Sequence, residues 1–385
     1  MYILHLPSWT PNENDPLNGN FIDKQIEAIS LYAPSITLRL IKDKTKNHTE
    51  INKNNPQNIV ITKYLKASFW DKIIGIRQLR LYLKGRKSLS AIINQHGKPA
   101  FIHLHVAYPY GVIAVDVAKS LHIPLILSEH WSAYLTHFHA NKKDDFSPFQ
   151  RSLIRSVFRN IRGFSAVSHF LLENIQKHYP KVQGVVIPNV VNTDKFRPVQ
   201  PIKKEKKTIL HISTLDDKSK NISGLIRAVS QLAKERNDFI LNIIHEKRNK
   251  FIEELVQTEQ LHSIVHFLGR KNEDEVVSHI QESDFLILFS NYETFGCVIV
   301  EAFACGKPVI ATNIGALPEL VNENRGLLVP VRDEAALCQA MSQMLASHDK
   351  YDSCKLHKYA KEHFSPVKVG QLFADWYQAL LSKQQ

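Results

Sequence analysis

Two glutamates, Glu293 and Glu301, lie in the stretch of the chain richest in potential chemistry, residues 291–312 (NYETFGCVIVEAFACGKPVIAT). The apolar run before them, residues 284–290 (DFLILFS), is typical of a buried parallel strand. We expect residues 294–304 to form a helix. A strand, a turn with a glycine and a helix start together make a corner that binds anions through backbone N–H groups and the helix dipole. Both carboxylates can then face one ligand, because two helical turns separate them.

The spacing of the two glutamates is weak evidence by itself, since such pairs are common on solvated helix faces. The flanks of Glu301 add information, because residues 297–300 (CVIV) and 302–304 (AFA) are almost wholly apolar. An ionised carboxylate in such a helix is costly unless a polar group pairs with it. The pattern therefore favours a ligand-binding carboxylate over a solvated one.

The whole string resembles the E-x7-E signature of family 4 of the retaining glycosyltransferases, which use nucleotide sugars and have the two-domain GT-B fold. The resemblance implies that Glu293 contacts the donor sugar and that Glu301 contacts the ribose of the nucleotide. It also implies donor contacts for Phe295, Gly296 and Cys297, in the turn between them.

Lys220, in the stretch HISTLDDKSKNISG, resembles the lysine of this family that faces the donor pyrophosphate. A cation there stabilises the charge of the leaving group. The family's Gly-Arg-Leu is Ser-Thr-Leu here, beginning at Ser213, so the arginine is absent and Lys220 acts alone or with Lys218. An exposed lysine in a polar loop is the plain alternative. Arg270 follows Gly269 and resembles a residue that lines the base pocket.

The first half of the chain offers three further candidates by the same resemblance. His130 follows an apolar strand and resembles the histidine that hydrogen-bonds the donor sugar, where a neutral imidazole adds no charge. Gly19 and Asn20, in the stretch PLNGNF, resemble a loop that meets the donor or acceptor. A core histidine and a plain turn are the alternatives.

His103 and His105 share one face of a predicted strand, residues 101–106. Two histidines so placed could bind a metal, but no third ligand stands at a suitable spacing in the sequence. We expect a buried strand with His105 facing the interdomain cleft, and no metal. The nucleotide sugar, UDP- or GDP-linked, would be a co-substrate, and no cofactor is expected.

A chain of 385 residues exceeds one typical core, and repeated strand–helix units predict parallel sheets covered on both faces. We expect an α/β protein with two Rossmann-like, doubly wound domains facing across a cleft. The expected boundaries are residues 1–197 for an acceptor-binding domain and 198–364 for a nucleotide-sugar-binding domain. A proline-rich, basic linker covers residues 197–207. A terminal helix, residues 365–385, would pack back on the first domain, as in the resembling family.

The net charge of +12 is concentrated in the first half of the chain. Residues 1–200 hold 26 Lys and Arg against 13 Asp and Glu, whereas residues 201–385 hold 23 against 24. The segment from Lys63 to Lys98 has nine basic residues and one acid, with interleaved aromatic and aliphatic residues such as Phe69 and Trp70. A basic amphipathic helix of this kind is typical of proteins that bind anionic membranes. A surface helix whose apolar stripe faces the core is the alternative. No motif accompanies the charge to suggest a nucleic-acid partner.

These features predict a retaining hexosyltransferase that acts on a glycan or lipid-linked acceptor in the synthesis of surface polysaccharide or lipid-linked glycans. A non-catalytic sugar-nucleotide-binding subunit and a GT-B epimerase are the alternatives. The four cysteines show no paired spacing and are expected to be reduced thiols. With no signal peptide or transmembrane run in the sequence, we expect a cytoplasmic enzyme, peripheral on the inner face of the cell membrane.

Overall fold

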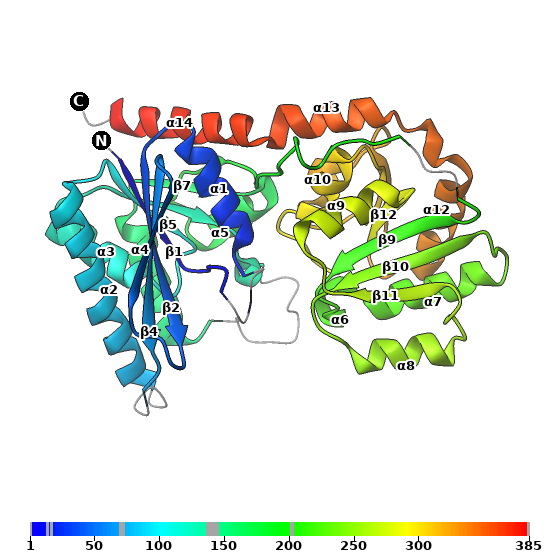
Figure 1. The fold of residues 1–385 in the computed structure, drawn as a ribbon, viewed down its shortest axis with the longest axis horizontal. Coiled ribbons are helices and arrows are strands. Elements are labelled where there is room, and N and C mark those ends of the chain that lie inside the picture. The colour runs from blue at the N-terminus through cyan, green and yellow to red at the C-terminus, as the bar shows by residue number, and fades with distance from the viewer. Residues whose placement is uncertain are drawn as a thin grey trace. The chain divides into compact units, whose positions relative to one another are not determined.

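The computed structural model describes residues 2–12, 15, 18–68, 74–135, 146–200 and 204–382. The chain divides into two compact units, which are described separately (Figure 1). Unit 1 is Met1–Val190 with Pro366–Gln385, and unit 2 is Val191–Ser365. The boundary falls between Val190 and Val191, before the proline-rich stretch 197–207 that the composition marks as a linker. Of the predicted segments, Phe69, Trp70 and the first two residues of PLNGNF lie outside the described residues.

Unit 1 contains an eight-stranded sheet in which every described neighbour pair is parallel except the first. His5 lies opposite His103 in the register of the two central strands. The strands, in their order across the sheet, are β3 (Thr49–Asn55), β4 (Asn58–Lys66), β2 (Ser35–Asp43), β1 (Ile3–Pro7), β5 (Phe101–His105), β6 (Leu125–Glu129), β7 (Gly163–Ala166) and β8 (Val185–Val186).

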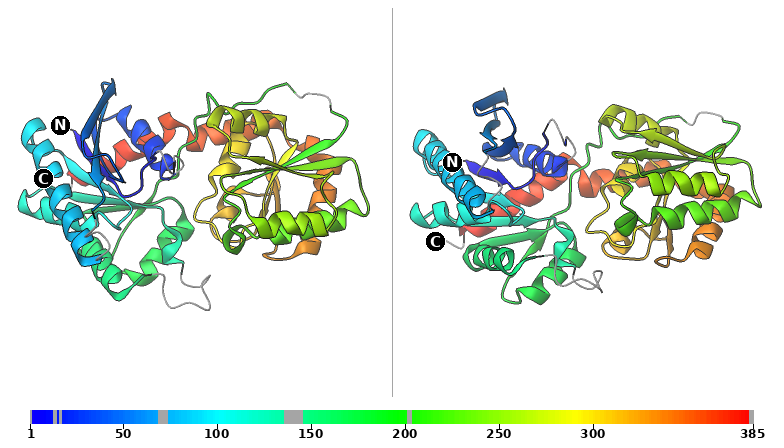
Figure 2. Two further views of the ribbon diagram at one scale, coloured as in Figure 1. Left: turned by 60° about the horizontal axis from the view of Figure 1, so that its bottom comes forward. Right: turned by 90° about the horizontal axis from the view of Figure 1, so that it is seen from below.

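Helices cover both faces of this sheet. The first and last helices run side by side in all views and share a buried cluster in which Phe373, Trp376 and Leu380 meet Ile29 (Figures 1 and 2). On the other face α2 packs on α3, and α3 packs on α4. The helices of unit 1 are α1 (Asn20–Ser30), α2 (Ile74–His96), α3 (Gly111–Ser120), the 3-10 turn η2 (Ser132–Tyr134), α4 (Pro148–Asn160), α5 (His169–His178) and α14 (Pro366–Ser382).

Unit 2 contains a six-stranded sheet that is parallel throughout its described pairs. Its strands, in order, are β11 (Val265–Gly269), β10 (Phe239–His245), β9 (Lys207–Ser213), β12 (Phe285–Leu288), β13 (Val309–Thr312) and β14 (Gly326–Val329). Its helices are α6 (Asp217–Lys220), α7 (Ile222–Ala233), α8 (Lys250–Thr258), α9 (Glu273–Glu282), α10 (Cys297–Ala304), α11 (Leu317–Leu320), α12 (Glu334–Ser347), the 3-10 turn η4 (His348–Lys350) and α13 (Ser353–Phe364).

The structure corrects the bounds of two predicted helices and adds strands that the sequence pattern did not predict, β3 among them. Strand β3 was not expected, because its sequence TEINKNN has one apolar residue, Ile51, and that side chain is 56% exposed at the edge of the sheet. The basic segment from Lys63 to Lys98 is not one helix: β4 extends to Lys66, and the described helix begins at Ile74. Helix α10 begins at Cys297 rather than at residue 294, since Gly296 adopts a left-handed conformation with φ 94°.

Candidate active site

Glu293 and Lys220 form an ion pair at the carboxyl edge of the unit 2 sheet. Lys220 is the last residue of α6, after β9, and Glu293 lies in the turn between β12 and α10. Parallel strands that neighbour each other, as β9 and β12 do, bring their following loops to the same edge. The hydroxyl of the buried Ser290 donates to Glu293 Oε1 at 3.0 Å. Both side chains of the ion pair stay partly exposed, so a ligand can reach them.

Asn291 joins the two loops that carry this pair. Its backbone N–H donates to the carbonyl of Ser219 at 2.8 Å, and its Nδ2 donates to the carbonyl of Lys218 at 2.9 Å. Its Oδ1 accepts from Arg332 Nε at 3.0 Å. The distance between Glu293 and Lys220 is therefore fixed by backbone contacts, and does not depend on the ion pair alone.

Two glycines shape the backbone around Glu293. Gly296 precedes α10, and its left-handed φ of 94° turns the chain into the helix. Gly315 has φ 61°, and a Cβ there would lie 2.3 Å from the carbonyl oxygen of Glu293. Any side chain at Gly315 would displace Glu293. Gly315 was not among the predicted site residues, although a glycine soon after a buried strand, in ATNIGALPE, is a signal of close backbone approach.

Ser213 and the buried His211 support the loop before Lys220. The carbonyl of Ile287 can only accept, so its contact with His211 Nδ1 at 2.9 Å places the proton on Nδ1. Burial lowers the pKa of His211 to about 4, with a smaller effect from the charge of Lys220, and the ring is neutral. Its Nε2 therefore accepts from the Ser213 hydroxyl at 2.8 Å, and Ser213 Oγ accepts the N–H of Leu215 at 3.2 Å. The Ser213 hydroxyl is thus engaged within the protein.

The remaining predicted donor residues of unit 2 differ in what they can offer a ligand. Cys297 and Glu301 lie on the partly exposed stripe of α10, whose other side is buried. Glu301 is therefore not enclosed by its apolar helix. The ring of Phe295 is buried, 5.8 Å from that of Phe364, so this residue has its backbone to offer. Arg270 is exposed after β11, next to Gly269, whose φ is 69°.

His130 lies in unit 1, directly after β6, and is 5% exposed. Neither of its ring nitrogens has a partner of hydrogen-bonding geometry among the described residues. Burial lowers its pKa to about 3, and the side chain of Asn189, which lies close enough to interact with the ring, opposes this effect. A neutral, buried imidazole with unsatisfied nitrogens is costly in isolation, so this side chain is suited to hydrogen-bond a ligand.

Gly19 and Asn20 begin helix α1 at the same end of unit 1 as His130. Gly19 has φ 71° and is the N-cap of α1, and a Cβ there would lie 2.5 Å from the carbonyl oxygen of Trp9. Phe21 follows, and its ring centroid is 4.9 Å from that of His130. The structure thus brings together two candidates that are far apart in the sequence.

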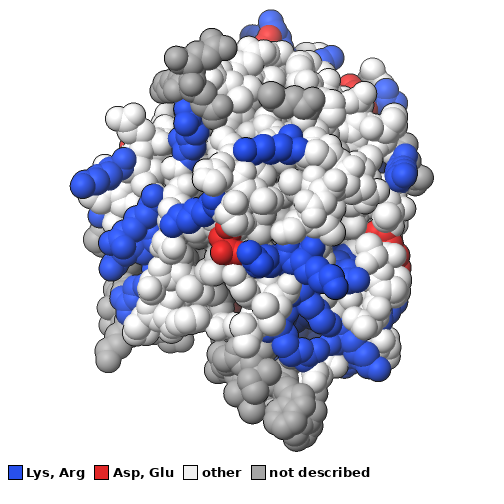
Figure 3. Space-filling view, turned by 90° about the vertical axis from the view of Figure 1, so that its left-hand side faces the viewer, with Lys and Arg blue, Asp and Glu red and all other residues white. Residues whose placement is uncertain are grey.

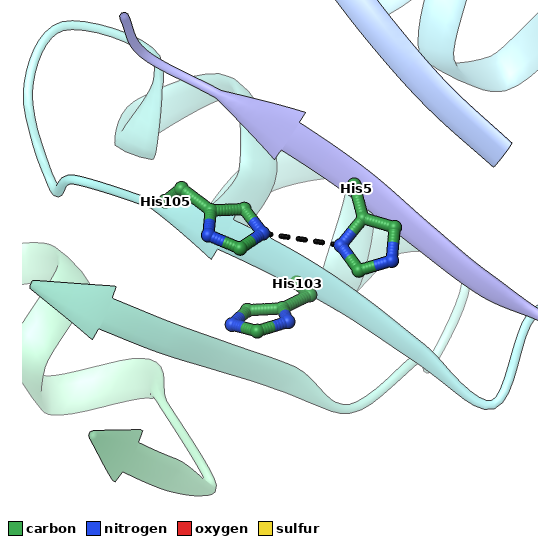
Figure 4. Close-up of side chains that lie close together, drawn as sticks. All are labelled: His5, His103 and His105. Carbon is green, nitrogen blue, oxygen red and sulfur yellow. Dashed lines mark hydrogen bonds between the residues drawn. The ribbon is translucent and has the colours of Figure 1, made fainter. Parts of the chain in front are cut away.

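A cluster of three buried histidines fills the centre of unit 1 (Figure 4). His105 stacks on His103 with ring centroids 4.1 Å apart, and its Nε2 is 3.1 Å from Nδ1 of His5 on β1. The prediction that His105 faces a cleft is wrong, because the side chain is fully buried. His5 supplies the third histidine that the sequence spacing did not reveal, since β1 pairs with β5 in register.

The three histidines have nitrogens within 4.8 Å of one another, and neutral imidazoles are ligands that Zn²⁺ accepts. Burial lowers the pKa of each ring, to about 3 for His5. However, both nitrogens of His5 and of His103 already have partners. His103 contacts Tyr377 Oη at 2.7 Å and Ser128 Oγ at 2.8 Å, and His5 Nε2 contacts Ser35 Oγ at 3.2 Å. We therefore interpret the cluster as a hydrogen-bonded core.

Comparisons with known proteins agree with the fold of the two units. The family model described as "Glycosyl transferases group 1" matches residues 192–363, and the model described as "Glycosyltransferase Family 4" matches residues 67–195. An uncharacterised glycosyltransferase of Methanocaldococcus jannaschii is 28% identical over 330 residues, which are 84% of this chain and 86% of that protein.

A putative teichuronic acid biosynthesis glycosyltransferase of Bacillus subtilis is 25% identical over 364 residues, 89% of each chain. Among solved structures, Anabaena Alr3699/HepE in complex with UDP and glucose is similar, with a TM-score of 0.72 and 17% identity over 98% of this chain and 99% of that one. The two family models together span most of the described chain. The chain therefore belongs to the group 1, or family 4, glycosyltransferases, and its two Rossmann-like units form their GT-B fold.

Proposed function

We propose that this protein transfers a hexose from a UDP- or GDP-linked sugar to a hydroxyl of an acceptor, with retention of the anomeric configuration. The observation that carries the proposal is the pair of Glu293 and Lys220 at the start of α10, in a chain of this family. A relative of the same fold is described as bound to UDP and glucose, which supports a nucleotide-sugar donor.

Each group has a defined part in the reaction. The bond from the anomeric carbon to the diphosphate oxygen breaks, and a bond to the acceptor oxygen forms on the same face of the sugar. The proton of the acceptor hydroxyl passes to the departing phosphate oxygen. Lys220 stabilises the charge on the diphosphate, and Glu293 holds the sugar while positive charge develops on its ring. No metal is needed in this scheme, because Lys220 and the N-terminus of α10 supply the positive charge.

Donor binding exchanges one ion pair for another. Without donor, Glu293 satisfies the ammonium group of Lys220. A diphosphate is a stronger partner for the lysine, and sugar hydroxyls can take its place at Glu293. Ser290 keeps Oε1 of Glu293 in position during this exchange. The neutral His130 donates a hydrogen bond to the donor sugar in this proposal, as the family resemblance implies.

The acceptor in this proposal is a glycan or lipid-linked precursor at an anionic membrane surface. Two large apolar side chains of α2, Leu79 and Leu83, are 56% and 55% exposed and lie one turn apart. Basic residues flank them, and Lys87 among these is exposed. Figure 3 shows Lys and Arg side chains gathered on this face of unit 1 with few acids between them. Exposed leucines among cations are suited to the headgroup region of anionic lipids.

The opposite face of α2 matches the alternative interpretation of the basic segment, in which an apolar stripe faces the core. Leu81, Leu89 and Ile92 are buried there, against unit 1. The hydrophobic residues of α2 thus lie on two faces of the helix: one face packs against unit 1, and the other is exposed. None of the described helices has the length and apolar character needed to cross a bilayer. The similar Bacillus subtilis protein, a putative teichuronic acid biosynthesis glycosyltransferase, supports an acceptor of the surface-polysaccharide class.

A thermal-shift panel tests the donor class. UDP, GDP, ADP and CMP, and the matching nucleotide sugars, are added to the protein without metal. A ligand at 100 times its dissociation constant adds about 2.7 kcal/mol of stability. A selective shift with UDP or GDP, followed by sugar release to acceptor or water, supports the proposal. A protein that shifts with a nucleotide sugar but never turns it over is a binding subunit, and absence of any shift contradicts a donor site.

A further inference from the structure

We propose that Glu129 is a positioning residue for His130: a buried carboxylate that holds the backbone of the sugar-contacting histidine. This inference rests on the proposed role of His130. Glu129 is the last residue of β6 and is fully buried. Its two oxygens accept four hydrogen bonds, and no cationic side chain among the described residues pairs with it.

The four donors come from two connections: residues 130–134, which follow β6 and include η2, and the loop after β5. Oε1 accepts the backbone N–H of His130 at 2.9 Å and of Trp131 at 3.1 Å. Oε2 accepts the backbone N–H of Ala107 at 3.0 Å and the hydroxyl of Tyr134 at 3.0 Å. The carboxylate thus joins the start of the His130 loop to the loop after β5 and to η2. We call these five residues the Glu129 clamp.

The clamp fixes the main chain at His130 without using its imidazole. All contacts of Glu129 with His130 use the backbone N–H, so the ring nitrogens keep their capacity for hydrogen bonding. The His130 ring packs against the ring of Phe21, with 4.9 Å between their centroids. Trp131 packs edge-on against Trp9 at 5.7 Å, which fixes the next residue. A site that must place one N–H group on a sugar needs this kind of support.

Burial raises the pKa of the Glu129 carboxyl, whereas its four hydrogen-bond donors oppose this effect and favour the carboxylate. Three of the four donors are backbone N–H groups, which cannot turn round to accept. Burial raises the pKa of the Tyr134 hydroxyl, and the charge of Glu129 adds to this effect, so the hydroxyl remains a donor. A glutamine has the same shape but one acceptor oxygen. If the glutamine oxygen faces His130 and Trp131, the glutamine NH₂ group faces the N–H of Ala107. The hydrogen bond to the loop after β5 is then lost.

The test is a double-mutant cycle of Glu129→Gln and His130→Ala, read as kcat and as affinity for the free nucleoside diphosphate. Glu129→Gln should lower kcat roughly 10- to 100-fold, because small displacements of a positioned group have effects of this size. Its diphosphate affinity should equal that of the wild type, since Lys220 lies in unit 2. In the His130→Ala background, Glu129→Gln should cause no further loss, because the group it positions is absent.

Two variants keep the test informative if Glu129→Gln folds poorly. Tyr134→Phe removes one of the four donors and should lower kcat by a smaller factor. Tyr377→Phe is the matched control: it removes a buried hydroxyl contact of 2.7 Å from unit 1, to His103, and should leave kcat unchanged. If Glu129→Gln lowered kcat by the same factor in the wild type and in His130→Ala, the inference would be overturned while the proposed function would stand. Normal kcat in His130→Ala itself would overturn the role of His130 in the proposed function, and the inference with it.

Discussion

The two units use polar groups in opposite ways. In unit 2 the central strands β9, β12 and β13 carry mainly apolar buried side chains, with His211 as an exception, and Glu293 meets Lys220 at their carboxyl edge. In unit 1 the two central strands, β1 and β5, carry the buried histidines His5, His103 and His105, and His103 contacts Tyr377 of α14. A polar edge can exchange partners when a ligand arrives. A polar core must keep its hydrogen bonds, because no water replaces them.

The edge of unit 2 should therefore tolerate removal of Glu293 without unfolding, at a large cost in activity. Glu293→Ala is expected to lower kcat by about 10³-fold or more, since a group that stabilises developing charge is lost. Among the described residues, its side chain is hydrogen-bonded to Lys220 and Ser290, so the melting temperature should change little. The measurement is turnover of the donor identified by thermal shift, beside a melting curve.

Glu323→Ala is the matched control, because Glu323 is an exposed glutamate of the same unit. It should keep wild-type turnover. If Glu293→Ala turned over donor at a near-normal rate, Glu293 would have no part in the reaction.

The core of unit 1 should instead be sensitive to acid. Burial holds the pKa of His5 and His130 at about 3, and that of His103 and His105 well below the usual value of 6.5. The unfolded chain takes up protons on these histidines below pH 6.5 and the folded chain does not, so stability falls as the pH falls. Each ring contributes up to about 1.4 kcal/mol per pH unit, and four contribute about 5 kcal/mol per pH unit.

Unit 2 has one described histidine with such a lowered pKa, His211, at about 4. Unit 1 should thus open first between pH 6.5 and 5. Hydrogen exchange followed by mass spectrometry measures the opening of each unit in one sample. Parallel loss of protection in both units would contradict the comparison. His178→Gln, at an exposed histidine of unit 1, should leave the profile unchanged.

Lys220 provides a third test, on the binding of the diphosphate. Lys220→Ala removes a charge-assisted contact. It should lower the affinity for the free nucleoside diphosphate, measured by calorimetry, roughly 10- to 100-fold. Lys234→Ala, at an exposed lysine of unit 2, should bind as the wild type does. Unchanged affinity in Lys220→Ala would remove this lysine from the site and would assign the phosphates to the N-terminus of α10 alone.

The same contrast explains which features the sequence predicts. The corner around Glu293 is built from contiguous residues, and a strand, a glycine turn and a helix can be recognised within about twenty positions. The histidine cluster depends on register between β1 and β5, about a hundred residues apart, so His5 could not be assigned from spacing. Strand β3 has no apolar alternation, because its side chains lie at an exposed edge.

Two further residues escaped prediction for related reasons. Glu129 is followed in the sequence by a more conspicuous histidine, and the four donors that define its role come from positions 107 to 134. Gly315 supports Glu293 through a backbone contact that only the packed chain reveals. Local patterns thus give the site of unit 2, whereas the polar groups of unit 1 are specified by tertiary contacts.

The smallest expected effect concerns the basic face of unit 1. Each Lys or Arg near an anionic bilayer contributes about 1 kcal/mol. Arg86 is in an ion pair with Asp116 at 2.6 Å, so part of its charge is already balanced. Changing Lys84, Arg86 and Lys87 together to Gln should lower co-sedimentation with anionic vesicles up to about 100-fold, and Lys87→Gln alone should have a larger effect than Arg86→Gln.

Salt should weaken the wild-type interaction in the same assay, because the charges are exposed and screened. The matched control changes three exposed lysines of unit 2, Lys250, Lys355 and Lys358, to Gln, and should sediment as the wild type does. Equal losses in both triple variants would mean that net charge alone attracts the protein to the vesicles. An unaltered unit 1 variant would exclude α2 as the anchor. A loss confined to that variant would show that the basic residues of α2 attract the protein to the vesicles.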